Sequence, residues 1–331
     1  MARATWALSV VLLSSCATEG ARPPPAPPPA PRAESPLRVV VVSDLNGEYG
    51  ETSYGDPVHA AVERVVGLAP DLVLSTGDMV AGQRRGLDYP AMWAGFHAAV
   101  SDPLEQAAIP FAVAPGNHDA SGYRLFAEER AAYAEAWRAR RPRVTFVDDS
   151  EFPFRYSFVA GPAFFVALDA TTVGPLDEAQ MRWLDAALAA APRGVRIVFG
   201  HVPLHPFTIG RERESIGDAA LEALLRRHDV DLFVSGHHHA YYPGRRGPLR
   251  LVSMACLGGG PRPLIGTEER SERAILAFEV TEDGVRDLDA FAGDAFDERV
   301  ARAALPVVVG EGDHAIHRDD VAGGEVSTQL R

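Results

Sequence analysis

The chain has 331 residues, of which 47% are hydrophobic and 23% charged, a composition typical of a globular protein with one large or two modest domains. The formal net charge is -13 and the arginine pairs are isolated, so the sequence lacks the basic stripe that a nucleic-acid polymer requires. The two cysteines, Cys16 and Cys256, are too few for a disulfide framework, and the apolar run around Cys256 predicts a buried free thiol.

The N-terminus has the layout of an export signal. Arg3 precedes a short apolar stretch and a group of small residues, which is typical of a signal peptide over residues 1–15. The apolar stretch is too short to span a bilayer as a mature helix. The sequence LSSC, which ends at Cys16, resembles the lipobox of bacterial lipoproteins, and this resemblance implies cleavage before Cys16 and acylation of that residue. A plain secretory signal with an incidental cysteine is the alternative.

A proline-rich segment follows over residues 16–36, and such segments form extended, semi-stiff spacers. Several acyl chains anchor a protein stably where one does not. We therefore expect an exported protein of the bacterial cell envelope, lipid-anchored at the outer membrane or the periplasmic face.

The remaining elements alternate between strands and helices and then become hairpins. Strands are predicted at 37–44, 71–80, 111–119, 195–201, 231–239 and 249–257, helices at 56–69, 123–140 and 176–191, and hairpins at 154–171 and 274–291. This order predicts an α/β domain with mixed sheets over residues 37–296. Residues 297–331 are polar and weakly patterned, so we expect a peripheral C-terminal tail there.

Polar residues follow five of these strands at their carboxyl ends, where α/β sheets bind ligands. They are Asp44, Asp78, the three residues Asn117, His118 and Asp119 of a GNHD sequence, His201, and the three histidines 237–239 of a GHHH sequence. Each alone is often a cap or turn residue. Their fixed order, each after an apolar strand and nearly each after a glycine, predicts instead a metal site.

The order D-x-N, GD, GNHD, GH, GHxH resembles the calcineurin-like metallophosphoesterase superfamily, over roughly residues 39–240. The resemblance implies a four-layer α/β/β/α sandwich, in which two mixed β-sheets are flanked by helices. It also implies two divalent metal ions and hydrolysis of phosphate esters by a metal-bridging hydroxide.

The resemblance assigns a role to each motif residue by position. Asp78 would bridge the two ions, and His118 would protonate the leaving oxygen or stabilise its charge, with Asp119 orienting it. The other implied ligands are Asp44 and His239 for the first ion, and Asn117, His201 and His237 for the second. His238 would point away from the ions. Mixed nitrogen and oxygen donors suit Mn, Fe, Zn or Co.

Asn46 departs from the pattern, because the family usually has a histidine ligand of the first ion at this position. Asn46 ligates directly, or holds a ligating water, or leaves the first site weak; these three interpretations stay open. A second departure concerns the purple acid phosphatase variant, which has a tyrosine three residues after the bridging aspartate. Ala81 occupies that position here, so a tyrosinate–iron centre is not expected.

We therefore predict a metal-dependent hydrolase whose substrate is a small phosphate ester. One alternative is a phosphodiesterase acting on nucleotides or lipid head groups, and another is a non-catalytic metal-binding envelope lipoprotein. The intact pair of His118 and Asp119 argues against the latter, since a scaffold needs no acid for a leaving group. The loop after Asn46, with Glu48 and Tyr49, either shapes the substrate pocket or is an ordinary polar loop.

Overall fold

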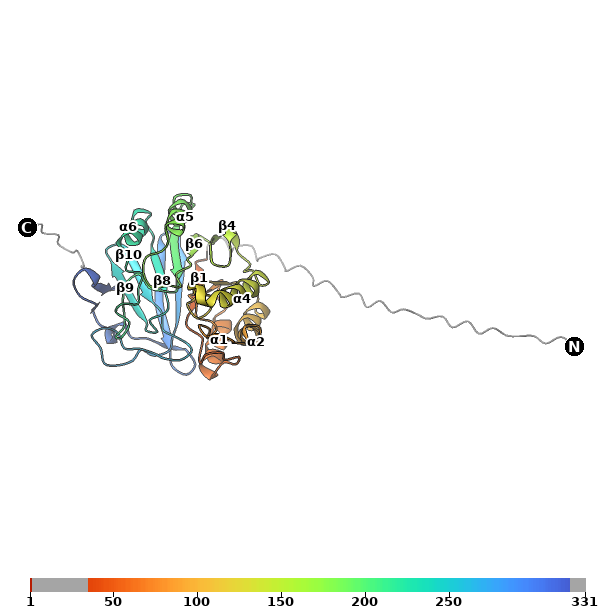
Figure 1. Ribbon diagram of the computed structural model, residues 1–331. Coiled ribbons are helices and arrows are strands. Elements are labelled where there is room, and N and C mark those ends of the chain that lie inside the picture. Colours follow the sequence, from red (N-terminus) through yellow and green to blue (C-terminus); the bar gives the residue numbers. More distant parts are fainter. Residues whose placement is uncertain (2–34, 322–331) are drawn as a thin grey trace, which may run out of the picture. The chain divides into compact units, whose positions relative to one another are not determined.

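The computed structural model describes Met1 and residues 35–321 (Figure 1). The chain divides into two units, Met1–Ala30 and Pro31–Arg331, and every contact given below lies within the second. The predicted signal peptide, Cys16 and nearly all of the proline-rich linker lie outside the described residues, so these predictions stay predictions. In the part of the chain that is described, no helix combines the length and the apolar character that a membrane crossing demands.

Two mixed β-sheets form the centre of the fold. The six-stranded sheet has the order β13-β12-β11-β1-β2-β3, and the nine-stranded sheet has the order β14-β15-β9-β10-β8-β7-β6-β5-β4. The strands of the first sheet are β1 (Leu37–Val42), β2 (Leu72–Ser75), β3 (Phe111–Val113), β11 (Ile275–Thr281), β12 (Gly284–Ala292) and β13 (Glu298–Arg299). Those of the second are β4 (Thr145–Glu151), β5 (Arg155–Ala160), β6 (Ala163–Ala167), β7 (Val195–Gly200), β8 (Leu232–Ser235), β9 (Tyr242–Arg246), β10 (Leu249–Ser253), β14 (Val308–Val309) and β15 (Ile316–Arg318).

Helices cover the outer faces of the two sheets. The α-helices are α1 (Asp56–Leu68), α2 (Tyr89–Phe96), α3 (Asp102–Gln106), α4 (Ala127–Arg138), α5 (Glu178–Ala189) and α6 (Ala219–Arg227). Shorter elements are the π-helical turn η1 (His97–Ser101) and the 3₁₀ turns η2 (Arg124–Phe126), η3 (Arg302–Ala304) and η4 (Gly312–His314). Figure 1 shows α1, α2 and α4 grouped together, away from α5 and α6. The predicted fold class, two mixed β-sheets flanked by helices, is confirmed.

Strand β6 shows why two apolar cores form. Its residues are all buried, and successive side chains of a strand point to opposite faces. Phe165 packs between the sheets, where its ring is stacked 4.9 Å from that of Phe158 on β5. Phe164 faces the other way and belongs to the core that holds Leu184 of α5 and Leu221 of α6. Burial on both faces explains the continuous apolar runs in the sequence.

The parallel strands fix where the site lies. In the first sheet β1, β2 and β3 are parallel, and in the second β6, β7, β8 and β10 are parallel. Their carboxyl ends therefore meet at one edge of each sheet. Asp44, Asp78 and Asn117 follow the strands of the first sheet, while His201 and His237 follow those of the second.

The predicted peripheral tail from residue 297 is wrong for the described part of that segment. β13 pairs with β12, and β15 pairs with both β9 and β14, so the segment extends both sheets. The side chains of Val309 and Ile316 are fully buried. Strands of two or three residues between polar flanks carry too little periodicity to be recognised in a sequence.

Replacing Ile316 tests whether this segment is part of the core. The Ile316 side chain packs against Gly244 of β9, so Ile316→Ala is expected to lower the free energy of unfolding by about 2–5 kcal/mol. Chemical denaturation measures the change. Val307→Ala, at a position 51% exposed, should cost less than about 0.5 kcal/mol. Equal, small losses in both variants would show that the segment is peripheral after all.

Candidate metal centre

Asp44 lies just beyond β1 and its carboxylate is fully buried. Oδ2 accepts hydrogen bonds from the Ser43 hydroxyl at 2.5 Å and from the backbone N–H of His237 at 3.1 Å. Oδ1 lies 3.2 Å from Nε2 of His239. Burial opposes the charge of this carboxylate, but the neighbouring His239 holds the pKa of Asp44 below its usual value.

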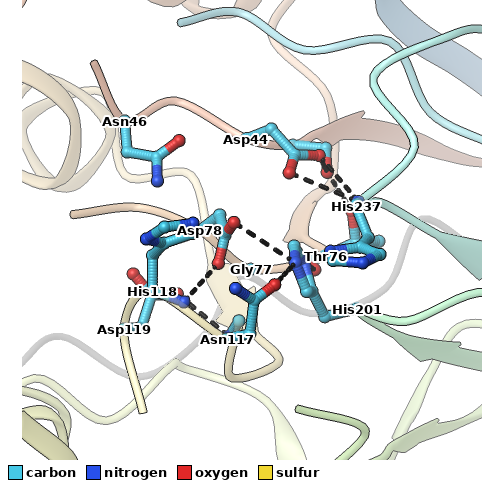
Figure 2. Close-up of polar contacts among 12 residues, drawn as sticks. Asp44, Asn46, Thr76, Gly77, Asp78, Asn117, His118, Asp119, His201 and His237 are labelled. Atoms are coloured by element: carbon cyan, nitrogen blue, oxygen red, sulfur yellow. Dashed lines mark hydrogen bonds and ion pairs between the residues drawn. The ribbon is translucent and has the colours of Figure 1, made fainter. Parts of the chain in front are cut away.

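Asp78 lies just beyond β2 and is also buried. Its Oδ1 accepts the backbone N–H of His118 at 2.8 Å, and its Oδ2 lies 3.3 Å from Nε2 of His201 (Figure 2). Burial again works against ionisation, and the positive charge available at His201 lowers the pKa of Asp78 well below its usual range. Two carboxylates from neighbouring strands are thus kept ionised at the edge where the sheets meet.

His201 shows that the site is built for a cation. Its Nδ1 lies 2.9 Å from the Thr76 carbonyl oxygen, which can only accept, so Nδ1 carries a proton. In the neutral ring Nε2 is then a lone pair, yet it faces the Asn117 Oδ1 at 2.8 Å and the Asp78 carboxylate. A lone pair and two acceptor oxygens repel unless a proton or a metal ion lies between them. The Asp78 carboxylate overcomes the effect of burial and raises the pKa of His201 to about 9, so this position favours positive charge.

His239 repeats this arrangement on the other side of Asp44. Its Nδ1 lies 3.1 Å from the Gly260 carbonyl oxygen, which leaves Nε2 facing the Asp44 carboxylate. Burial disfavours the charged ring, but Asp44 raises the pKa of His239 to about 10. Carbonyl groups that fix the imidazole tautomer in this way are typical of metal-ligating histidines.

His237 and His238 differ in role although they are adjacent. The backbone N–H of Phe207 donates to Nδ1 of His238 at 3.0 Å, so the proton of the neutral His238 ring is on Nε2. This Nε2–H donates to the Glu214 carbonyl oxygen at 2.9 Å. Both nitrogens of His238 are thereby used in holding a loop. Burial lowers the pKa of His237 to about 4, which favours the neutral ring that a metal ion requires.

Four predicted ligands have left-handed backbone conformations, which non-glycine residues rarely adopt. Their φ angles are 49° for Asp44, 54° for Asp78, 65° for His237 and 55° for His239. Each such residue costs on the order of 1–3 kcal/mol and persists only where the surroundings impose it. The sharp turn after each strand is therefore imposed by the fold, and it directs these side chains toward one another.

Glycines before the motif residues are required for close approach. A Cβ atom on Gly116 would lie 2.0 Å from the backbone nitrogen of Asp78 and 2.2 Å from its Oδ1. A Cβ atom on Gly236 would lie 2.3 Å from the Ser43 hydroxyl and 2.7 Å from Oδ2 of Asp44. Only glycine allows the GNHD and GHHH turns to reach the two carboxylates.

Asn46 is buried beside this cluster, and its backbone N–H donates to the Asp78 carbonyl oxygen at 3.1 Å. Its side-chain amide donates only a long bond of 3.5 Å to the Val80 carbonyl oxygen. In Figure 2 no dashed line joins Asn46 to the other labelled residues, and its carboxamide turns toward the side that holds Asp44 and Asp78. Among the described residues the carboxamide oxygen has no hydrogen-bond partner, and the three interpretations of Asn46 stay open.

Asp119 does not orient His118, and the prediction of that role is wrong in this structure. Its Oδ1 accepts the backbone N–H groups of Met79 and Val80 at 2.7 and 2.8 Å, and its Oδ2 accepts that of Gly116 at 3.0 Å. The His118 ring is instead placed by the Tyr49 ring, 5.6 Å away between centroids, and by the Gly82 carbonyl oxygen, 3.4 Å from Nδ1. Asp119 therefore ties the turn that carries Asp78 to the turn that carries Asn117.

The donor set fits a divalent metal ion. Asp44, Asp78 and His201 each offer one ligand atom, these atoms lie within 4.8 Å of one another, and all three residues are buried. Carboxylate oxygens, a carboxamide oxygen and imidazole nitrogens together are the ligands that Mn, Fe, Zn and Co share.

Sequence reasoning missed two residues next to His237. Arg211 and Glu214 lie in the loop between β7 and α6, and both contact the His237 ring. Their sequence, RERE, has mixed charge and no periodicity, so nothing in it distinguishes them from solvated surface.

Comparison with known proteins identifies the family. The sequence model of the calcineurin-like phosphoesterases matches residues 37–241. Purple acid phosphatase 15 of Arabidopsis thaliana is 25% identical over 269 residues, which are 72% of this chain and 47% of that protein. The chain therefore belongs to the calcineurin-like phosphoesterase family, and the predicted family and enzyme class are confirmed at that level.

Solved structures show the same fold. Purple acid phosphatase PPD1 from yellow lupin, Lupinus luteus, has a TM-score of 0.63 at 18% identity and covers 82% of this chain and 54% of its own. A dimetal phosphatase from Danio rerio has a TM-score of 0.55 at 17% identity, with 80% of this chain and 98% of its own covered. This chain thus spans about half the length of the two purple acid phosphatases.

A variant of Asp119 tests the role that the structure gives it. In Asp119→Asn an N–H₂ group replaces one oxygen and faces backbone N–H groups, so the two turns should loosen. We expect metal affinity to fall about 10- to 100-fold, because supporting residues of metal sites typically contribute that much. Competition with a chromogenic chelator measures this affinity.

The matched control is Asp149→Asn, which removes the same charge from an exposed ion pair with Arg141. It should leave the metal affinity unchanged. If Asp119→Asn instead kept its metal affinity and changed only the pH profile of hydrolysis, Asp119 would act on His118 as the sequence predicted.

Proposed function

We propose that this protein is an exported, lipid-anchored hydrolase of small phosphate esters that works with two divalent metal ions. The observation that carries this proposal is the arrangement around Nε2 of His201, where acceptor oxygens of Asp78 and Asn117 surround a ring nitrogen that is itself an acceptor in the neutral tautomer. Such a cluster is stable only with positive charge inside it.

The residues present would divide the ions as follows. Asp78 lies between the two groups of donors and would bridge the two ions. Asp44 and His239 would hold the first ion, with Asn46 or a water on it completing the set, and Asn117, His201 and His237 would hold the second. When bound, such ions neutralise phosphate oxygens and lower the pKa of a bound water toward neutrality.

The chain supplies the proton for the leaving group. His118 is fixed by its backbone N–H to Asp78, and its Nδ1 lies near the Gly82 carbonyl oxygen, so Nε2 is left to face the ester. A histidine in this position donates its proton to the departing oxygen as the ester bond breaks. The Tyr49 ring lies against His118 and limits how the imidazole can turn.

The cellular location in this proposal rests on the N-terminal sequence alone. The signal-like stretch, the lipobox resemblance at Cys16 and the proline-rich spacer agree with one another. An exported location favours nucleotides, lipid head groups or other scavenged esters as substrates over cytoplasmic signalling molecules.

Metal titration with two substrates tests the activity. Mn²⁺ is added to chelator-stripped protein while hydrolysis of a chromogenic phosphomonoester and a chromogenic phosphodiester is followed. We expect the rate to reach a plateau at about two ions per chain. Faster hydrolysis of the diester would favour the phosphodiesterase alternative. A plateau at one ion per chain would show that, with Asn46 in place of histidine, the first metal site does not bind its ion.

His118→Asn separates catalysis from metal binding in the same titration. The ring is not a ligand here, so this variant should keep both ions and lose about 100- to 10,000-fold in rate. Full rate in this variant would disprove the role of His118. Metal binding by the native chain without turnover of either ester, across several metals, would favour the non-catalytic lipoprotein.

Asn46→His tests whether Asn46 belongs to the first site. A nitrogen ligand in place of a weak carboxamide should raise the affinity for the first ion about tenfold or more. Competition with a chelator measures this, and Gln106→His, on the exposed end of α3, is the control for an added histidine. An unchanged affinity would place Asn46 outside the coordination sphere.

A further inference from the structure

The loop that carries Arg211 and Glu214 is fixed beside the metal centre. Thr208 forms an isolated bridge with Leu264, and the backbone N–H of Ile209 donates to the Pro263 carbonyl oxygen at 3.1 Å. The backbone N–H of Ile265 donates back to the Phe207 carbonyl oxygen at 2.9 Å. Arg211 therefore extends from a braced turn, and its side chain is only 15% exposed.

The Arg211 guanidinium lies against the face of the His237 ring. Its Nη1 is 2.9 Å from Nε2 and 3.2 Å from Nδ1 of that ring. The two ring nitrogens point in different directions, so one N–H group cannot be directed along both. Because the guanidinium stacks on the face of the ring, it leaves the in-plane direction at Nε2 open, so Nε2 could bind an ion after it loses its proton, with a positive charge next to it.

The Glu214 carboxylate contacts both the Arg211 guanidinium and the His237 ring. Its Oε2 lies 2.8 Å from Nη1 of Arg211 and 3.1 Å from Nε2 of His237. An oxygen of a phosphoryl group bound at the metal centre would need contacts of the same kind, with the guanidinium on one side and the His237 site on the other. The Glu214 side chain is 42% exposed, so it can rotate into solvent.

Positive charge here exceeds what Glu214 balances. Nε of Arg211 and Nε of Arg262 are both buried, and neither has a hydrogen-bond partner among the described residues. Arg262 follows the glycines beside His239 and donates its backbone N–H to the His239 carbonyl oxygen at 3.2 Å. Burial lowers the pKa of Arg262, and the charge of Arg211 lowers it further, so the two guanidiniums influence each other. An anion with more charge than one carboxylate would satisfy both.

We propose that Arg211 binds the phosphoryl oxygens of the substrate, and that Glu214 holds that place with its own carboxylate until the substrate displaces it. This rests on the proposed function and narrows its substrate class. A phosphomonoester carries two negative charges on its phosphoryl group and a phosphodiester carries one. The excess positive charge therefore favours monoesters.

Binding of inorganic phosphate tests this without any turnover. Phosphate binding is measured by isothermal titration calorimetry on the metal-loaded full chain. We expect Arg211→Gln to bind phosphate about 10- to 100-fold more weakly, because the variant loses a charged hydrogen bond. Glu214→Gln should bind phosphate several-fold more tightly, because the competing carboxylate is gone. Dimethyl phosphate, a diester monoanion, should lose less affinity in Arg211→Gln than inorganic phosphate does.

An exposed pair on α5 provides matched controls. Arg182 and Glu178 lie 3.3 Å apart with side chains 72% and 93% exposed, so Arg182→Gln and Glu178→Gln remove the same charges from an exposed pair outside the loop. Both controls should bind phosphate like the native chain. The proposal fails if Arg211→Gln binds phosphate normally, or if it weakens both anions equally, which removes the monoester preference.

The number of bound ions decides the role of Glu214. If Glu214→Gln lowers the metal content measured by elemental analysis, Glu214 is a ligand and not a placeholder. These binding results are separate from the test of the proposed function. A native chain that hydrolyses neither ester but shows the expected phosphate pattern would refute the proposed function alone, and the reverse result would refute only the role of Arg211.

Discussion

Contacts between two buried carboxylates and two histidines across the sheets hold this site together. Asp44 and Asp78 follow strands of the six-stranded sheet, and His239 and His201 follow strands of the nine-stranded sheet, at 3.2 and 3.3 Å. Buried charges are tolerated only when paired, so the edges of the two sheets must stay in register. The same pairing creates a demand for positive charge, which bound metal ions would meet.

That arrangement requires strained backbone conformations at the two carboxylates, and hydrogen bonds of Asp119 help to maintain these conformations. Left-handed conformations at Asp44 and Asp78 are strained for residues with a Cβ atom. Asp119 accepts three backbone N–H groups from the turns beside them, which offsets part of the strain. Because Asp119 is next to His118 in the sequence, it was predicted to orient that histidine. Its contacts in the structure show that it stabilises the turns instead.

Local charge in the site differs from the charge of the whole chain. The net charge of -13 would repel a phosphate ester, yet Arg211 lies beside the candidate metal centre and Arg262 is close enough to influence it. Within residues 35–321 Glu214 is the only carboxylate that contacts Arg211. Metal ions bound at this site would add further positive charge. An acidic chain can therefore still attract anionic groups to this region.

The sequence by itself determined the strand ends, because an apolar run that stops at a glycine and a polar residue marks the edge of a sheet whatever else surrounds it. Asp44, Asp78, Asn117, His201, His237 and His239 could be placed on that basis together with the family resemblance. The tertiary structure alone decided the role of Asp119, the pairing of β15 with β9 and the contact of Arg211 and Glu214 with His237. These depend on residues brought together from distant parts of the chain by short strands and aperiodic loops, and local sequence patterns carry no record of such contacts.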